Sequence, residues 1–161
     1  MSQKITPNLW FDNEAEEAAS FYTSVFKNSR VLNVARYSEA GPRPAGTVMT
    51  VEWELDGQRF VGINGGPQFK FDEAVSFQID CEDQDEVDYY WEKLTEGGEE
   101  SQCGWLKDRF GLSWQVVPQG MGELFSDPDP QRAERAMKAM LQMRKLDIEE
   151  LRRAADGEPV S

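Results

Sequence analysis

Residues 47–64 read TVMTVEWELDGQRFVGIN, and this stretch decides the fold. Two β-rich runs, Thr47 to Leu55 and Arg59 to Asn64, flank the dipeptide Asp56-Gly57. This dipeptide is a strong signal for a tight β-hairpin turn, because both central residues of such a turn need a positive φ. The stretch therefore predicts two antiparallel strands, and the segments around it decide which sheet they join.

The residues before the hairpin predict a strand, a helix and a further strand. Gln3 to Phe11 is an extended run, and Asn13 and Glu16 have the spacing of a helix capping box. Ser29 to Tyr37 is typical of a strand, and residues 39–46 are a loop rich in Gly and Pro. The apolar residues of the helix fall on one face, namely Ala15, Ala18, Ala19, Tyr22, Val25 and Phe26. The first segment therefore has the order βαβββ.

The same pattern starts again after the hairpin. Ala74 to Cys81 alternates apolar and polar residues as a strand does. Residues 83–86 read DQDE, a second capping-box pattern, and Gly97-Gly98 ends the helix that follows it. Strands are expected at Glu99 to Lys107 and at Leu112 to Val117. A repeated supersecondary unit is the plain interpretation.

The fold class that follows is α+β, with two βαβββ modules forming a curled mixed sheet around a cleft, plus C-terminal helices. We expect a first module at residues 1–66, a second at residues 67–120 and a helical extension at residues 121–156, all within one compact domain.

The C-terminal extension does not repeat the modules. Asp129-Pro130 is typical of a helix cap followed by proline at the first helical position, and Asp147 caps a short last helix. Met137, Met140 and Met143 could line a promiscuous binding groove. The amphipathic pattern favours the alternative, a helix packed on its own sheet or on a second subunit.

The composition excludes several function classes. The chain has 30 acidic and 17 basic side chains, and its net charge of −13 repels nucleic-acid phosphates and anionic lipid. No apolar run approaches the roughly 18–20 residues that span a bilayer, and no secretion signal follows Met1. Cys81 and Cys103 lack the CxxC spacing of a zinc knuckle. We therefore expect a cytoplasmic protein with reduced thiols that binds neither nucleic acid nor membranes.

Several sequence segments carry a resemblance to a known family. They are Leu9-Trp10-Phe11-Asp12 with Glu16-Glu17-Ala18, Asn64-Gly65-Gly66-Pro67 with Phe69-Lys70-Phe71, Cys103-Gly104-Trp105-Leu106-Lys107-Asp108, Phe110-Gly111-Leu112-Ser113-Trp114-Gln115, and Ala139-Met140-Leu141-Gln142-Met143. Together with the paired modules, they resemble the PhnB-like group of the vicinal oxygen chelate superfamily, which includes glyoxalase I, extradiol dioxygenases and bleomycin-resistance proteins. The resemblance extends from about Ile5 to Leu151.

Members of this group often carry the label 3-demethylubiquinone-9 3-methyltransferase, which the residues here do not support. S-adenosylmethionine enzymes commonly use a Gly-rich strand-to-helix turn in a doubly wound sheet. Gly65-Gly66 follows a strand and Gly97-Gly98 follows a helix, and neither pair opens a helix. We therefore expect no methyl transfer.

The resemblance also implies where metal-using members place their ligands, on the first and last strands of each half. Those positions correspond to Thr6 or Asn8, Asn64, Ser76 and Gln115. Amides and hydroxyls are weak neutral ligands, and the chain has no histidine to supply the imidazole that such sites prefer. We therefore expect no metal ion and no other cofactor.

A cleft lined by amides, hydroxyls and aromatic rings is suited to binding a small molecule. Asn64 also suits a plain turn, and Trp105 also suits packing within the sheet. Cys103 is the one candidate nucleophile, but without a histidine base an inert thiol is the favoured interpretation. No catalytic residue can be assigned. The predicted ligand-binding residues are Asn8, Trp10, Asn64, Phe69, Ser76, Cys103, Trp105 and Gln115.

The sequence therefore predicts a PhnB-like homodimer that binds a small molecule of unknown identity in a metal-free cleft, with the reaction unknown. One alternative is a vicinal oxygen chelate enzyme, a lyase, isomerase or dioxygenase, with an atypical site. The other is a structural or regulatory dimer that uses the Met-containing helix as an interaction surface.

Overall fold

The hairpin predicted at Asp56-Gly57 is present in the computed structural model, which describes residues 3–158. β3 (Val48–Leu55) and β4 (Gln58–Asn64) pair antiparallel, and Leu55 lies opposite Gln58 across the turn. Asp56 and Gly57 have φ values of 49° and 85°. Both turn residues thus adopt the positive φ that a two-residue hairpin requires.

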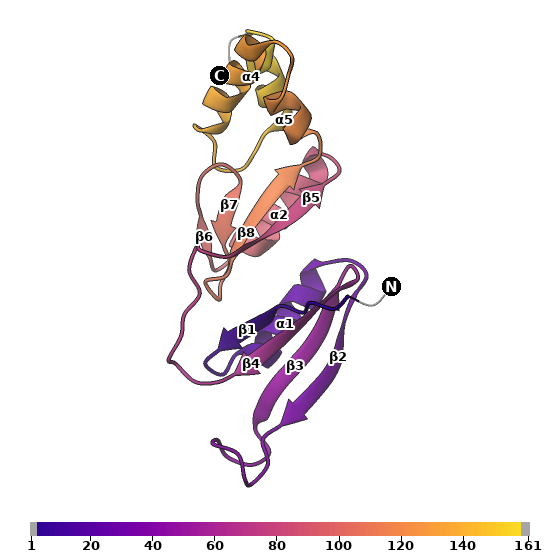
Figure 1. The fold of residues 1–161 in the computed structure, drawn as a ribbon, viewed down its shortest axis with the longest axis vertical. Helices are drawn as coiled ribbons and strands as arrows, with labels where there is room; N and C mark the ends of the chain where they lie inside the picture. The colour runs from indigo at the N-terminus through magenta and orange to yellow at the C-terminus, as the bar shows by residue number, and fades with distance from the viewer. Residues whose placement is uncertain (1–2, 159–161) are drawn as a thin grey trace. The chain divides into compact units, whose positions relative to one another are not determined.

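The first module adds two strands and a helix to this hairpin. β1 (Asn8–Phe11) pairs parallel with β4, and β2 (Ser29–Arg36) pairs antiparallel with β3, giving the strand order β1-β4-β3-β2. Figure 1 shows α1 (Ala15–Val25) against this sheet, and its contacts are with β2, β3 and β4. Buried between helix and sheet, Trp53 lies 5.9 Å from Tyr22 and 6.0 Å from Phe60, measured between ring centroids.

The predicted capping box at the start of α1 is wrong. The N-cap residue is Glu14, and its side chain makes no capping hydrogen bond. The backbone N–H of Ala15 donates instead to Oδ1 of Asn64, at 2.9 Å. The last residue of β4 therefore caps the helix, and a contact between residues so far apart in sequence leaves no local signal.

The second module repeats the first. β5 (Ser76–Cys81), α2 (Gln84–Thr95), β6 (Glu99–Glu100), β7 (Trp105–Lys107) and β8 (Ser113–Pro118) form a second four-stranded sheet in the order β5-β8-β7-β6. The outer strand β5 is parallel to β8, as β1 is to β4. The predicted cap of the second helix is confirmed, because the Asp83 side chain accepts from the backbone N–H of Glu86.

The prediction of one continuous strand from Glu99 to Lys107 is wrong. The chain turns between β6 and β7, where Cys103 and Gly104 have φ values of 60° and 86°. Their backbone N–H groups donate to the carbonyls of Met143 and Arg144. This break separates β6 from β7 and gives the second sheet its fourth strand.

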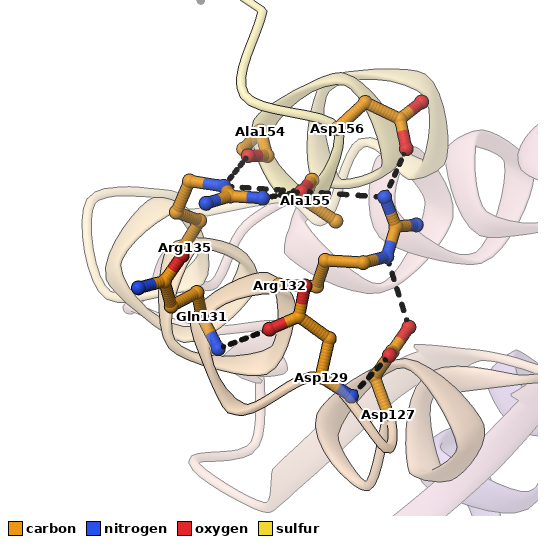
Figure 2. Close-up of polar contacts among 8 residues, drawn as sticks. All are labelled: Asp127, Asp129, Gln131, Arg132, Arg135, Ala154, Ala155 and Asp156. Carbon is orange, nitrogen blue, oxygen red and sulfur yellow. Dashed lines mark hydrogen bonds and ion pairs between the residues drawn. The ribbon is translucent and has the colours of Figure 1, made fainter.

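The C-terminal residues form α3 (Met121–Phe125), α4 (Pro130–Met140) and α5 (Ile148–Ala155). Asp129 and Asp147 cap α4 and α5 as predicted. Figure 2 shows the contacts that join α4 to the end of α5: Arg132 pairs with Asp156, and Arg135 donates to the carbonyls of Ala154 and Ala155. Arg132 also pairs with Asp127, in the segment just before α4, at 3.1 Å.

Contacts divide the chain into two units, Met1–Phe71 and Asp72–Ser161, so the C-terminal helices belong with the second module. The α+β class and the two βαβββ modules are confirmed. The predicted boundaries at residues 66 and 120, and the single compact domain, stay predictions. Within residues 3–158, no helix is long and apolar enough to cross a membrane.

Candidate functional site

Each sheet has one face covered by its helix and one open face, and the open faces carry most of the predicted ligand-binding residues. In β1, Leu9 and Phe11 are buried on the helix side, so Asn8 and Trp10 lie on the open side. In β8, Trp114 and Val116 are buried on the helix side, so Gln115 lies on the open side. Strand alternation therefore decides which predicted residues could meet a ligand.

Trp10 and Phe69 form an aromatic pair on the first module. Their ring centroids are 4.9 Å apart in an edge-to-face arrangement. The Trp10 indole donates from Nε1 to the Gly66 carbonyl at 2.9 Å and lies against Gly65, where an added Cβ would be 2.2 Å from the ring. Phe69 is 64% exposed. The structure thus holds Trp10 in place and leaves apolar surface available beside it.

Asn8 and Asn64 do not lie on the same side of this sheet. Asn8 is exposed, and its Nδ2 donates to the Thr6 carbonyl at 3.0 Å. Asn64 is 5% exposed and lies opposite Phe11 in the register, on the helix side. Its Oδ1 accepts from the Ala15 N–H, and its Nδ2 donates to the Val48 carbonyl at 3.1 Å. Both polar ends of the Asn64 amide therefore bond within the protein.

The open face of the second sheet brings Ser76, Trp105 and Gln115 together. Gln115 lies opposite Gln78 of β5 and opposite Trp105 of β7. The Gln115 Nε2 donates to Oγ of Ser76 at 2.9 Å. Among the described residues, no group donates to the Gln115 Oε1. The pair thus offers a free acceptor at Gln115 and a free hydroxyl hydrogen at Ser76, next to the Trp105 indole.

The same face continues into a cavity that the sequence reasoning missed. Its volume is about 220 Å³, and Ser113, Lys107 and Trp105 are among its lining residues. Ser113 is buried, and its Oγ has no hydrogen-bond partner in the part of the chain that the structure describes. Ser113 lies two residues before Gln115 on β8, so the alternation that identified Gln115 also places Ser113 on the open face.

Lys107, at the rim of this cavity, is paired with Glu73. The hydrogen bond from Lys107 lowers the pKa of Glu73 below its ordinary value, and the same bond raises the pKa of Lys107. Both groups are therefore charged near neutral pH. The cavity wall carries one ammonium group, with Glu73, Glu99 and Glu100 as its acidic neighbours.

The two cysteines lie in different environments. Cys81 is buried, and this burial raises the pKa of its thiol to about 12. Cys103 is partly exposed in the turn between β6 and β7 and does not line the cavity beside Trp105. The chain has no histidine that could serve as a base for either thiol.

The residues at the implied metal-ligand positions do not fit a divalent ion. The Asn64 amide is bonded to the start of α1, and Gln115 donates its amide hydrogen to Ser76. Among residues 3–158, no group of three or more cysteine or carboxylate side chains is arranged to hold a metal. Neutral amides and hydroxyls compete weakly with water for such ions.

Comparisons with known proteins agree with this fold. A family model described as 3-demethylubiquinone-9 3-methyltransferase matches residues 3–117. The solved structure of a PhnB protein from Bacillus cereus, which carries the same description, is 38% identical. The match covers 72% of this chain and 99% of that one, with a TM-score of 0.66. No curated protein matches the chain significantly.

Two more distant structures share the fold alone. Protein PA1353 from Pseudomonas aeruginosa is 20% identical, with a TM-score of 0.60 over 73% of this chain and 98% of that one. The fosfomycin resistance protein FosX from Listeria monocytogenes, solved with Mn(II) and sulfate, is 16% identical, with a TM-score of 0.51 over 72% and 91% of the two chains.

Proposed function

The chain belongs to the 3-demethylubiquinone-9 3-methyltransferase family, in its PhnB-like group, and on that premise we propose that it binds a small polar molecule without a metal ion. The proposed site is the open face of the second sheet. The observation that carries the proposal is the Gln115–Ser76 pair, which leaves an acceptor and a donor side by side on that face.

The chemistry of this face suits a ligand that has both a polar and an apolar part. Gln115 and Ser76 would bond a group that donates and accepts, such as an amide, hydroxyl or carboxyl, at about 0.5–1.5 kcal/mol for each hydrogen bond. Trp105 would cover a ring or an alkyl part. The buried Ser113 hydroxyl supplies a further polar contact in the adjoining cavity. Small-molecule sites are usually composed in this way, with a few polar groups set in a mainly apolar surface.

The open face of the first sheet carries an aromatic surface of its own, formed by Trp10 and Phe69, with Asn8 on the same face of β1 as Trp10. The Asn64 side chain contributes to folding instead, since both of its polar atoms bond within the module. Cys103, in the turn just before Trp105, would at most border the ligand.

We do not propose methyl transfer, although the family description names it. The two sheets are mixed and four-stranded, not a doubly wound parallel sheet, and neither Gly65-Gly66 nor Gly97-Gly98 opens a helix. The turn on which such enzymes bind S-adenosylmethionine is therefore missing from residues 3–158. Tight stoichiometric binding of S-adenosylmethionine in calorimetry would reverse this conclusion.

We also propose that the protein is a cytoplasmic homodimer. β2 is an edge strand eight residues long that exposes Val31, Leu32 and Val34. Long apolar edge strands expose unpaired backbone groups that tend to pair with another chain. Light scattering at micromolar concentration should report twice the chain mass, and a monomer would contradict the proposal.

The binding proposal is tested by comparing the small molecules that purified variants retain. Protein is denatured, and the released compounds are measured by mass spectrometry for the wild type, Gln115→Leu and the control Gln58→Leu. Gln58 is a strand glutamine of the first sheet, outside the proposed site. We expect one compound to be retained by the wild type and by Gln58→Leu but lost from Gln115→Leu. Equal retention by all three proteins would refute a role for Gln115.

A further inference from the structure

Two arginines of the first module line a second cavity. Arg36 ends β2, and Arg43 lies in the loop that follows it. Both border a space of about 580 Å³ near the start of α1. No carboxylate of residues 3–158 forms an ion pair with either one, although the chain carries 30 acidic side chains.

Backbone carbonyls hold both guanidinium groups in place. Nη1 of Arg43 donates to the Asp12 carbonyl at 2.8 Å and to the Asn64 carbonyl at 3.4 Å. Nη1 of Arg36 donates to the Gly46 carbonyl at 3.0 Å. A guanidinium group carries five N–H donors, so most donors of each arginine remain for a ligand. Neutral carbonyls fix the geometry without cancelling the charge.

The surroundings of this cavity favour an anion. Asn13, just before α1, and Glu16, in its first turn, line the cavity, and a helix N-terminus carries the positive end of the helix dipole. Glu16 is the one carboxylate among the lining residues, and its side chain is exposed. Two fixed positive charges therefore face one negative charge that can turn toward solvent.

We propose that this cavity binds the phosphate group of a small phosphate monoester. Two guanidinium groups match the double charge of such a group, and their planar N–H pairs match its oxygens. A single carboxylate would use only half of this charge. All residues that line the cavity belong to the first module, whereas Gln115 lies on the second sheet, so this site is independent of the ligand proposed for Gln115.

Inorganic phosphate is the probe for the test. It is titrated into ¹⁵N-labelled protein at constant ionic strength, and the backbone amide signals of Arg43 and residues 45–48 are followed by NMR. We expect chemical-shift changes that saturate with phosphate concentration. Arg36→Gln should lower the affinity for phosphate by about tenfold or more, because it removes one charged hydrogen-bonding partner. Arg36 is exposed, so this variant should keep its fold, and the same spectra report whether it does.

Three further comparisons distinguish binding at a defined site from non-specific attraction to positive charge. Arg30→Gln removes the same charge from an exposed position of the same strand, outside the cavity, and should change the affinity by less than about twofold. Arg43→Lys keeps the charge but loses the planar donor pair, and should weaken binding. Acetate should bind more weakly than phosphate. Absence of saturation, equal weakening by Arg30→Gln and Arg36→Gln, or equal affinity for acetate and phosphate would overturn the proposal.

Discussion

Replacing Asn64 with alanine should destabilise the first module, because this side chain joins α1 to the central hairpin. Asn64 is buried at the end of β4. Its amide oxygen accepts from the Ala15 N–H at 2.9 Å, and its amide nitrogen donates to the Val48 carbonyl at 3.1 Å. The hydroxyl of Tyr37 bonds to the backbone carbonyl of Asn64, so the substitution leaves that contact in place.

The size of the effect follows from the two groups left without partners. Ala15 is fully buried, so its N–H cannot be satisfied by water, and an unsatisfied buried group costs about 1–3 kcal/mol. Val48 is half-buried, and water can reach its carbonyl more easily, which puts its cost at the lower end of that range. We therefore expect the free energy of unfolding to fall by about 2–4 kcal/mol.

Urea denaturation followed by far-UV circular dichroism measures this loss, and amide exchange of residues 15–25 locates it in α1. Asn8→Ala is the matched control, because Asn8 is exposed and its substitution should change stability by less than about 0.5 kcal/mol. Asn64→Asp keeps the acceptor for Ala15 but sets an oxygen against the Val48 carbonyl, so it should also destabilise. If Asn64→Ala proved as mild as Asn8→Ala, the capping role assigned to Asn64 would be refuted.

Three other predictions follow from single contacts. Iodoacetamide at pH 8 should label Cys103 and spare Cys81, whose thiol pKa is raised to about 12. Cys81 should react only after urea unfolds the chain, and equal labelling of both cysteines in the folded protein would contradict this. Glu73 has a pKa lowered from 4.5, so the stability of its pair with Lys107 is present above that value and is lost as the pH falls through the lowered pKa. Lys107→Gln should raise the pKa of Glu73 in an NMR titration, whereas an unchanged pKa would argue against the pair. Gly98→Ala would place a Cβ 2.1 Å from the Lys107 carbonyl oxygen and should cost about 1–3 kcal/mol in denaturation, while Gly122→Ala, with open space around it, should cost far less.

The parts of the fold that depend on neighbouring residues could be predicted from the sequence. The hairpin at Asp56-Gly57 and the caps at Asp83, Asp129 and Asp147 are examples, because the residues that form each of them are close in sequence. Contacts between distant residues could not be predicted in this way. The start of α1 is an example, because Asn64, 49 residues after Ala15, takes the place of the expected local cap.

The break in the strand predicted from Glu99 to Lys107 has the same cause. Carbonyls of Met143 and Arg144 accept from Cys103 and Gly104, far along the chain, and the local β-pattern gives no sign of them.

In the candidate site, the face of the sheet to which each strand residue points decides whether its side chain can meet a ligand. A shift of one residue moves a side chain to the other face of a sheet. Asn64 lies on the helix face because it is in register with Phe11, whereas Gln115 lies on the open face opposite Trp105. The cavity lined by Ser113, Lys107 and Trp105 could not be predicted from the sequence. Lys107 of β7 meets Glu73, in the loop before β5, only when the chain is folded.

Native mass spectrometry of freshly purified, untagged protein tests the central claim most directly, because it weighs subunits, metal ions and retained small molecules together. Binding of a small molecule without a metal predicts a dimer that carries an organic mass and no stoichiometric transition metal. One transition-metal ion per chain, with no organic mass retained, would contradict the claim and would indicate a metal-dependent site.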